Sequence, residues 1–393
     1  MVLLVFLLVT EILMLIVLKQ HFFAGSKPKY YIAFIIHILL SLWVWIVFIE
    51  NSLQKGHYDD PKHVWLMMCL TGLVVAVVIP RFIVSVLHFT GKMIRMNKGG
   101  HIRWLTDAGL ILMLLIILVI ARGTRHGRFD FKTEEVTLKI KNLDADLEGL
   151  RIVQISDLHL ISFYHHRKQL EEVIDSINRL HPDIIVNTGD FVSFGWREFE
   201  RNDTILAKSR SRYGNFAILG NHDVGTYDPE FTASDREENI RKMEELITAS
   251  GYKVLNDESA ILRIGNSRLA ISGVTTGGRH PHMTHGNIND AIAGSDSANV
   301  KILLLHDPNA WEESVAGKTD INVTLSGHTH GMQMGIITKN FRWSPAKYFY
   351  PHWNGLYISG EQLQYVNRGL GVLSIPFRIC MPPEITVLTL KKD

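Results

Sequence analysis

Carboxylate, imidazole and amide side chains follow five apolar segments in the second part of the chain. Each segment has the length and composition of a buried strand. Open α/β sheets bind ligands at the carboxyl ends of their strands, so we expect these side chains to meet at one rim. They are Asp157 and His159 after 150–156, Asp190 after 183–188, Asn221, His222 and Asp223 after 214–219, His306 after 300–305, and His328 and His330 after 321–326.

The residue types predict a centre with two metal ions. Imidazole and carboxylate suit Zn, Mn and Fe, and one bridging carboxylate can hold two ions about 3.5–4 Å apart. Alternation lets the loop turn both Asp157 and His159 toward one ion, and the same holds for His328 and His330. One such pair alone is more often structural than functional. All five groups in this order favour the metal site.

The elements that position these groups alternate between strands and helices, which predicts an α/β sandwich with antiparallel ends. The segments 252–255, 260–264 and 268–272 are expected to form antiparallel strands around the turn Gly265-Asn266. The other predicted strands are 135–140, 150–156, 183–188, 214–219, 300–305, 321–326, 356–358, 364–367 and 385–390, with helices at 166–180, at 236–250 and near Trp311.

Composition excludes several classes of protein. The chain has 393 residues, which favours two or three domains, and 47% of them are hydrophobic, which excludes a disordered or fibrous chain. Two cysteines, Cys69 and Cys380, exclude a disulfide framework and a cysteine-based zinc module. A net charge of +2 argues against a general nucleic-acid binder.

Charge density divides the chain near residue 121. Residues 1–121 contain 10 Lys/Arg and 5 Asp/Glu, whereas residues 122–393 contain 31 and 34. This predicts a four-helix transmembrane region at 1–121, a basic linker at 122–133 and a catalytic domain at 134–393.

Four apolar stretches lie at 2–18, 30–49, 64–89 and 104–121. Each approaches the roughly 20 residues that a membrane-spanning helix needs. The alternative is three spans with an interfacial third segment, because Pro80 and Arg81 interrupt that stretch. Glu11, Arg81 and Asp107 lie within or at the ends of spans, where charges are costly and often functional.

Basic residues give a nearly balanced orientation signal. The loops 19–29 and 90–103 share one side and carry 7 Lys/Arg, and the other side carries 6. Flanks of long domains count less in the positive-inside rule. The balance therefore favours an extracytoplasmic catalytic domain.

The residues at the strand ends resemble the calcineurin-like metallophosphoesterase superfamily, whose pattern is D-x-H, G-D, G-N-H-[D/E], H and G-H-x-H. The resemblance runs from about 134 to 392, and the tail at 365–371 and 382–385 is similar to a bacterial membrane-associated branch. Some members of that branch act on UDP-diacylglucosamine. Met332 departs from the glycine common in the branch, which bears on substrate shape and not on metal binding. The resemblance implies that the catalytic domain is a four-layer α/β/β/α sandwich. It also implies that the protein is located in a bacterial inner membrane.

The resemblance also implies a role for each residue. Two divalent ions are expected, with a metal-bridging hydroxide as the nucleophile and Asp190 bridging the ions. His222 would donate to the phosphate oxygen or leaving group, oriented by Asp223. The remaining implied ligands are Asp157, His159 and His330 for one ion, and Asn221, His306 and His328 for the second.

Substrate contacts are less specific. Arg368 and Arg378 are expected to clamp a phosphate as bidentate donors, against the alternative of structural ion pairs. His165 is expected at the mouth of the site. A loop with Arg279 faces either substrate or solvent and carries three further imidazoles, His280, His282 and His285.

The sequence thus predicts a membrane phosphoesterase that acts on an amphiphilic phosphate ester presented by the bilayer. The basic linker and a group of aromatic residues support a membrane-borne substrate, because such residues favour the lipid interface. Alternatives are a UDP-2,3-diacylglucosamine pyrophosphate hydrolase of lipid A synthesis and a non-catalytic membrane sensor or scaffold; the complete ligand set disfavours the latter. The aromatic residues are Trp343, Tyr348, Phe349, Tyr350 and Trp353, which fill the domain core in the alternative interpretation.

Overall fold

The computed structural model describes residues 2–23, 26–54, 56–95, 102–275, 286–338 and 340–393. The chain forms two compact units. The first comprises residues 1–55, 66–125 and 374–377, and we call it the helical unit. The second comprises residues 56–65, 126–373 and 378–393, and we call it the catalytic unit.

The described chain contains four helices long and apolar enough to cross a membrane, as the sequence predicts, and most of their residues belong to the helical unit. The third stretch is one continuous helical segment from Pro61 to Ile94. Its middle is a π-helical turn just before Pro80, which fits a position where proline removes a backbone donor. The segments are α1 (Val2–Leu18) with η1 (Lys19–Phe23), α2 (Lys27–Leu53), α3 (Pro61–Leu73) with η2 (Val74–Val78) and α4 (Ile79–Ile94), and α5 (Arg103–Arg125).

Two of the charges within the predicted spans pair with each other. Arg81 is buried and its Nη1 donates to Glu11 Oε1 at 2.7 Å, while Nη2 donates to the His37 carbonyl at 2.9 Å. Ser41 Oγ donates to Glu11 Oε2 at 2.7 Å. A buried charge is tolerated when it is paired and hydrogen-bonded. The network therefore links α1, α2 and α4.

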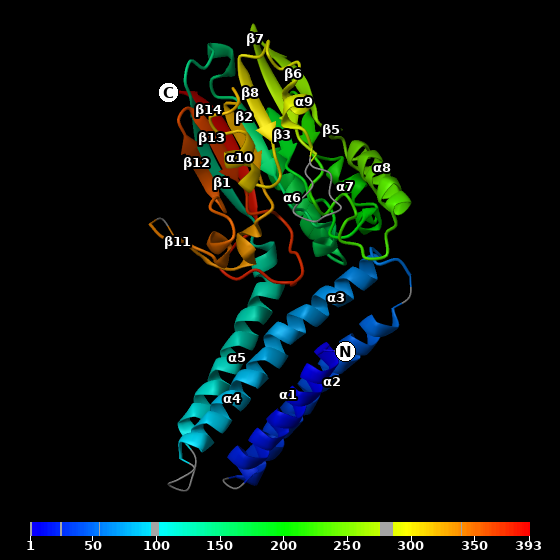
Figure 1. Cartoon of the computed structure of the whole chain (residues 1–393), viewed down its shortest axis with the longest axis vertical. Helices are drawn as coiled ribbons and strands as arrows, with labels where there is room; N and C mark the ends of the chain where they lie inside the picture. The colour runs from blue at the N-terminus through cyan, green and yellow to red at the C-terminus, as the bar shows by residue number, and fades with distance from the viewer. Residues whose placement is uncertain (1, 24–25, 55, 96–101, 276–285, 339) are drawn as a thin grey trace. The chain divides into compact units, whose positions relative to one another are not determined.

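The catalytic unit is built on two six-stranded sheets (Figure 1). Most strand pairs near the centre of each sheet are parallel, so their carboxyl ends share an edge. The first sheet has the order β1 (Lys132–Ile140), β14 (Glu384–Lys392), β2 (Arg151–Ile155), β3 (Ile184–Asn187), β4 (Asn215–Ala217), β5 (Lys253–Val254), and the second β12 (Gly355–Ser359), β13 (Gln362–Val366), β9 (Val323–Ser326), β8 (Val300–Leu304), β7 (Ser267–Gly273), β6 (Glu258–Ile264). A separate hairpin pairs β10 (Ile336–Ile337) with β11 (Arg342–Trp343).

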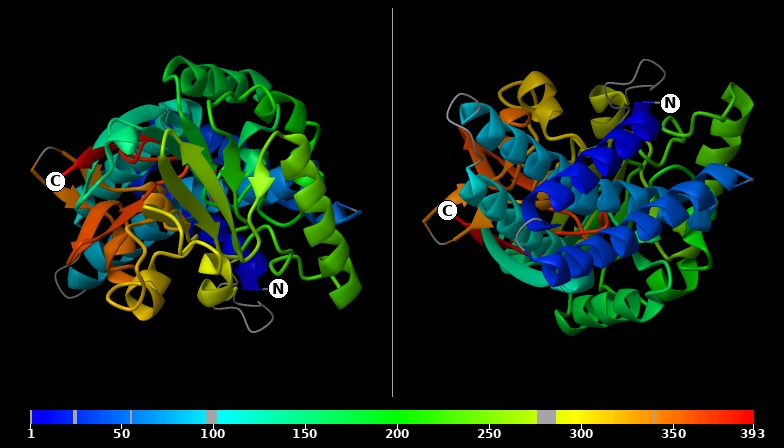
Figure 2. Two further views of the ribbon diagram at one scale, coloured as in Figure 1. Left: turned by 90° about the horizontal axis from the view of Figure 1, so that it is seen from above. Right: turned by 90° about the horizontal axis from the view of Figure 1, so that it is seen from below.

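Four layers follow from where the apolar side chains lie. Ile152 and Val186 of the first sheet share a buried core with Ile271 and Leu325 of the second. The helices α6 (Arg167–Arg179) and α8 (Ala233–Ala249) cover the other face of the first sheet. The short helices α9 (Ile288–Ile292) and α10 (Asn309–Ser314) cover the second sheet (Figure 2). The predicted α/β/β/α sandwich is confirmed.

Two local expectations differ from the structure. The segment 252–255 was expected beside the hairpin at Gly265, but β5 pairs in parallel with β4 of the first sheet. The hairpin turn fixes only the pairing of β6 with β7, so the chain changes sheets before β6. The segment 122–133 was expected to be a linker, but α5 continues through Arg122 to Arg125 and β1 begins at Lys132. Basic residues in the last turn of a helix interact favourably with its dipole.

Candidate metal centre

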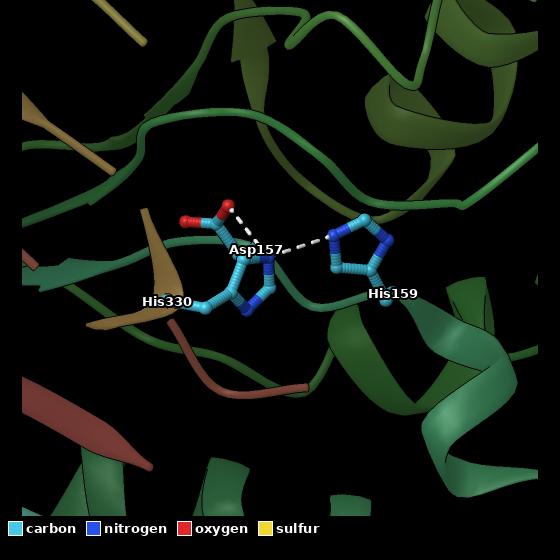
Figure 3. Close-up of side chains that lie close together, drawn as sticks. All are labelled: Asp157, His159 and His330. Atoms are coloured by element: carbon cyan, nitrogen blue, oxygen red, sulfur yellow. Dashed lines mark hydrogen bonds and ion pairs between the residues drawn. The ribbon is translucent and has the colours of Figure 1, made fainter. Parts of the chain in front are cut away.

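The first group of candidate ligands comes from the loops after β2 and β9. His330 Nε2 lies 3.2 Å from Asp157 Oδ1 and 3.1 Å from His159 Nε2 (Figure 3). One ligand atom of each of these three residues lies within 4.8 Å of the others. All three side chains are buried, which keeps bulk water from competing for an ion.

The second group comes from the loops after β3, β4, β8 and β9. His306 Nε2 lies 3.0 Å from Asp190 Oδ2 and 3.3 Å from His328 Nδ1. Asn221 Oδ1 approaches the same nitrogen of His328 to 2.8 Å. The sequence therefore brings together both predicted sets of ligands at adjacent strand ends.

Asp190 lies between the two groups. Its Oδ2 is 3.0 Å from His306 Nε2 and 3.7 Å from His159 Nε2. Its Oδ1 accepts a hydrogen bond from the backbone N–H of His222 at 2.9 Å. A carboxylate that reaches both groups at once is in the position that a bridging ligand requires.

The backbone around the ligands is constrained. A Cβ at Gly220 would lie 2.1 Å from Asp190 Oδ1, so only glycine allows this approach. Left-handed φ angles are uncommon in residues other than glycine and cluster at functional sites. Five candidate ligands adopt them: Asp157 (49°), His159 (36°), Asp190 (58°), His328 (73°) and His330 (49°).

The electrostatics of the site suit metal ligands. Burial and the neighbouring His330 hold the pKa of His159 well below its usual value, and burial and Arg378 do the same for His330. Both imidazoles are therefore neutral, which is the form that binds metals. Although burial opposes it, the positive field of His306 and His222 keeps the pKa of Asp190 well below its usual range.

The pKa of His306 reflects the negative charge around the second group. Burial opposes its protonation, but the nearby Asp190 carboxylate raises the pKa of His306 to about 10. The same field that favours a proton on this ring favours a divalent cation, and metal binding would release that proton. The donor set of imidazole, carboxylate and amide thus fits Zn, Mn or Fe.

His222 lies beside the two groups and is held by other contacts. Its Nδ1 donates to the Ser193 carbonyl oxygen at 2.7 Å, because a carbonyl can only accept. Its ring stacks on Tyr227 with 4.1 Å between centroids and meets the edge of His159 at 5.1 Å.

Asp223 does not orient the His222 ring as expected. Its carboxylate instead accepts from the backbone N–H groups of Asp190 at 2.8 Å, Gly220 at 2.9 Å and Val192 at 3.1 Å. Burial and the adjacent Asp190 raise the pKa of Asp223 to about 8, while these N–H donors act in the opposite direction. Asp223 thus positions the backbone around Asp190, and Ser193 takes the role of orienting the imidazole.

The two predicted phosphate-clamping arginines are engaged elsewhere. Arg368 is buried between Glu384 at 3.0 Å and Glu134 at 2.8 Å, so it forms the structural ion pairs of the alternative interpretation. Arg378 is also buried, and its Nη2 donates to the carbonyls of Gly371 at 2.6 Å and Arg368 at 2.9 Å. Arg378 therefore supports the backbone beside His330, and its Nη2 lies 3.5 Å from His330 Nδ1.

The predicted histidines near the mouth have different outcomes. His165 is exposed and its ring packs against Tyr164 at 4.0 Å, and neither metal group includes it. His280, His282 and His285 lie outside the described residues.

Three contacts of the site were missed in the sequence. Ser193 Oγ lies 3.0 Å from His159 Nδ1, the Tyr227 hydroxyl accepts from Asn221 Nδ2 at 3.1 Å, and the Tyr350 hydroxyl lies 3.0 Å from His328 Nε2. Such partners fix the orientation of metal-binding rings. No motif marks these loop residues; Tyr350 was singled out only as one of several aromatic residues.

Comparison with known proteins gives concordant matches. Residues 150–332 match the family described as calcineurin-like phosphoesterase. The uncharacterized metallophosphoesterase YkuE of Bacillus subtilis is 32% identical over 268 residues, covering 66% of this chain and 85% of YkuE. A transmembrane protein with metallophosphoesterase domain from Danio rerio is 28% identical over 373 residues, covering 89% of this chain and 80% of that protein. UDP-2,3-diacylglucosamine pyrophosphatase LpxG of Chlamydia trachomatis is 30% identical over 291 residues, covering 62% of this chain and 84% of LpxG.

Proposed function

The chain belongs to the calcineurin-like phosphoesterases, which are metal-dependent hydrolases of phosphoric esters, and we propose that its substrate is an amphiphilic phosphate ester or pyrophosphate carried by a membrane. Four helices of membrane-spanning length and apolarity accompany the catalytic unit. The Danio rerio relative, described as a transmembrane protein, aligns over 89% of this chain. A substrate dissolved in water would not need such a membrane region.

The proposed centre holds two divalent ions, Mn, Zn or Fe. Asp190 would join them, because its carboxylate contacts both groups of ligands. Such ions polarise a phosphoryl oxygen and lower the pKa of bound water to about 7. The proposed ligands are Asp157, His159 and His330 for one ion and Asn221, His306 and His328 for the other.

His222 is the proposed proton donor to the phosphate oxygen or leaving group. Its Nδ1 is bonded to the Ser193 carbonyl, so Nε2 is the nitrogen available for that role. The stacked Tyr227 limits rotation of the ring. Asp223 contributes indirectly by holding the loop that carries Asp190.

Exposed aromatic residues between 341 and 349 carry the substrate proposal. Phe341, Tyr348 and Phe349 are 54%, 69% and 62% exposed. Tyr348 and Phe349 directly precede Tyr350 in the chain, and the Tyr350 hydroxyl lies 3.0 Å from His328 Nε2. Exposed apolar and aromatic groups of this kind favour lipid interfaces and amphiphilic ligands. Trp353 is buried and belongs to the core of the domain instead.

A second candidate function is the hydrolysis of UDP-2,3-diacylglucosamine, the reaction named for the LpxG relative. Both functions would use the same metal centre. They differ in the leaving group, because only the pyrophosphate substrate releases a nucleotide. A non-catalytic sensor is disfavoured because the described ligand set is complete. The resemblance to the bacterial branch is the basis for placing the protein in a bacterial inner membrane. The slight asymmetry of basic residues is the basis for placing the catalytic unit outside the cytoplasm.

The test uses the full-length protein purified in detergent. Metal content is measured by mass spectrometry, and bis-p-nitrophenyl phosphate, UDP-diacylglucosamine and phospholipids are screened for hydrolysis. We expect close to two ions per chain and hydrolysis of at least one lipid ester. Full activity at near-zero metal content would contradict the metal centre, and nucleotide release without phospholipid cleavage would favour the second candidate.

A further inference from the structure

A pocket of about 230 Å³ lies within the catalytic unit and has an aromatic wall. Tyr58, Trp196 and Phe231 supply that wall. The first of these residues comes from 56–65, a segment of the catalytic unit that includes the start of α3. Tyr58 also packs edge-on against Phe194 at 5.2 Å, which fixes its ring against the loop before Trp196.

The remaining wall is strongly acidic. Four carboxylates line it: Asp228, Glu230, Asp235 and Glu238. The guanidinium on this wall, that of Arg197, is already paired, because its Nη1 lies 3.0 Å from the fully buried Asp59 carboxylate. The same guanidinium covers the Trp196 ring at 4.6 Å. His57 is exposed at the rim, and the lining retains an excess of negative charge.

Asp228 provides independent evidence that the pocket takes a ligand. The residue is 2% exposed, and its Oδ1 accepts from the Glu230 backbone N–H at 2.9 Å. Its Oδ2 has no hydrogen-bond partner among the described residues. An unpaired buried carboxylate oxygen is costly, and a cationic ligand that pairs with it removes that cost.

The chemistry of the walls distinguishes between classes of cation. A metal ion needs several ligand atoms close together, and among the described residues the two groups of the metal centre are the clusters of that kind. Aromatic faces combined with carboxylates instead suit an organic ammonium group. We propose that this pocket binds the ammonium group of a ligand such as choline or ethanolamine.

The pocket adjoins the proposed catalytic residues through two short segments. Tyr227 stacks on His222, and the next residue is Asp228. The Ser193 carbonyl holds the same imidazole, and Trp196 follows three residues later. On the premise of the proposed function, the ammonium group belongs to the head group of a zwitterionic phospholipid whose phosphodiester lies at the metal centre.

Binding is tested first, without reference to catalysis. Full-length protein in a maltoside detergent is titrated with choline by calorimetry. We expect saturable binding that Asp228→Asn weakens at least tenfold and Glu238→Gln weakens severalfold. Glu237→Gln is the matched control, because Glu237 is exposed on the same helix and does not line the pocket. Equal binding of the neutral isostere 3,3-dimethylbutanol, or no binding of choline, would overturn the proposal.

The source of the ammonium group is tested with vesicles. The kcat/KM for phosphatidylcholine is compared with that for phosphatidylglycerol of the same acyl chains. We expect wild type to prefer phosphatidylcholine, and Asp228→Asn to reduce that preference at least tenfold. Choline binding with equal use of both lipids would overturn the head-group assignment and indicate a free amine. Choline binding without hydrolysis of any lipid would contradict the proposed function while supporting the pocket.

Discussion

Replacing His222 with alanine separates proton transfer from metal binding. The His222 side chain belongs to neither group of metal ligands, and its backbone N–H, which holds Asp190 Oδ1 at 2.9 Å, survives the substitution. The ring itself bonds the Ser193 carbonyl, stacks on Tyr227 and meets the His159 ring edge-on, with 5.1 Å between the centroids of the two imidazoles. Metal content should therefore change little.

The expected loss of activity follows from the role of a general acid. Such a group contributes typically about 10²–10⁴-fold to the rate. At 1.36 kcal/mol for each factor of ten, the barrier rises by about 3–5 kcal/mol. The effect should appear in kcat, because the ring acts on the leaving group in the transition state and not on substrate binding alone.

The assay measures kcat for a phospholipid, whose alkoxide leaving group must be protonated, and metal per chain on the same preparations. His181→Asn is the control for loss of an imidazole, because His181 is exposed and lies at the end of α6, away from both ligand groups. We expect His222→Ala to retain its metal and lose at least a hundredfold in kcat. Loss of both ions would mean that His222 is a ligand, and unchanged kcat would remove it from the mechanism.

Three further substitutions test the bridging carboxylate, a buried ion pair and the membrane orientation. Asp190→Ala should abolish phosphodiester hydrolysis and lower bound metal, since this carboxylate contacts both groups; a variant with wild-type turnover and no metal would contradict the bridging role. Asp59→Ala leaves Arg197 without its carboxylate, and we expect the free energy of unfolding to fall by about 1–3 kcal/mol. Breaking a fully buried ion pair costs about 3–5 kcal/mol, and the cost is smaller here because the Arg197 side chain is 29% exposed. Thermal unfolding should then shift down by about 2–4 °C per kcal/mol, and an unchanged Tm would show that the pair contributes nothing. A cysteine at exposed Lys392, in a Cys380→Ser background because Cys380 is also exposed, should react with an impermeant maleimide in intact cells; labelling only after lysis would reverse the orientation.

The positions of the candidate ligands could be predicted from sequence because each follows an apolar parallel strand. Strand pairing then fixes which loops meet, and Asp157 and His330 come together although 173 positions separate them in number. The pairing of β5 could not be predicted, because a two-residue strand has no periodicity of its own. Val254 of this strand packs against the core that α6 and α8 cover.

The roles of individual polar side chains were harder to predict. Arg368 and Arg378 have the chemistry of phosphate ligands, yet both are buried among carboxylates and carbonyls that the linear sequence does not bring together. Asp223 is adjacent to His222 in sequence, but its carboxylate binds backbone N–H groups instead. Segment 56–65 belongs to the catalytic unit through contacts such as Asp59 with Arg197, although composition assigns it to the membrane region.

The reaction proposed for the metal centre is the cleavage of a phosphate ester presented by a membrane. Its most direct test compares, with the full-length protein, kcat/KM for a vesicle-borne phospholipid and for its deacylated, water-soluble analogue. The exposed aromatic side chains of Phe341, Tyr348 and Phe349 predict a clear preference for the vesicle-borne lipid. Equal or faster cleavage of the soluble analogue would contradict the claim.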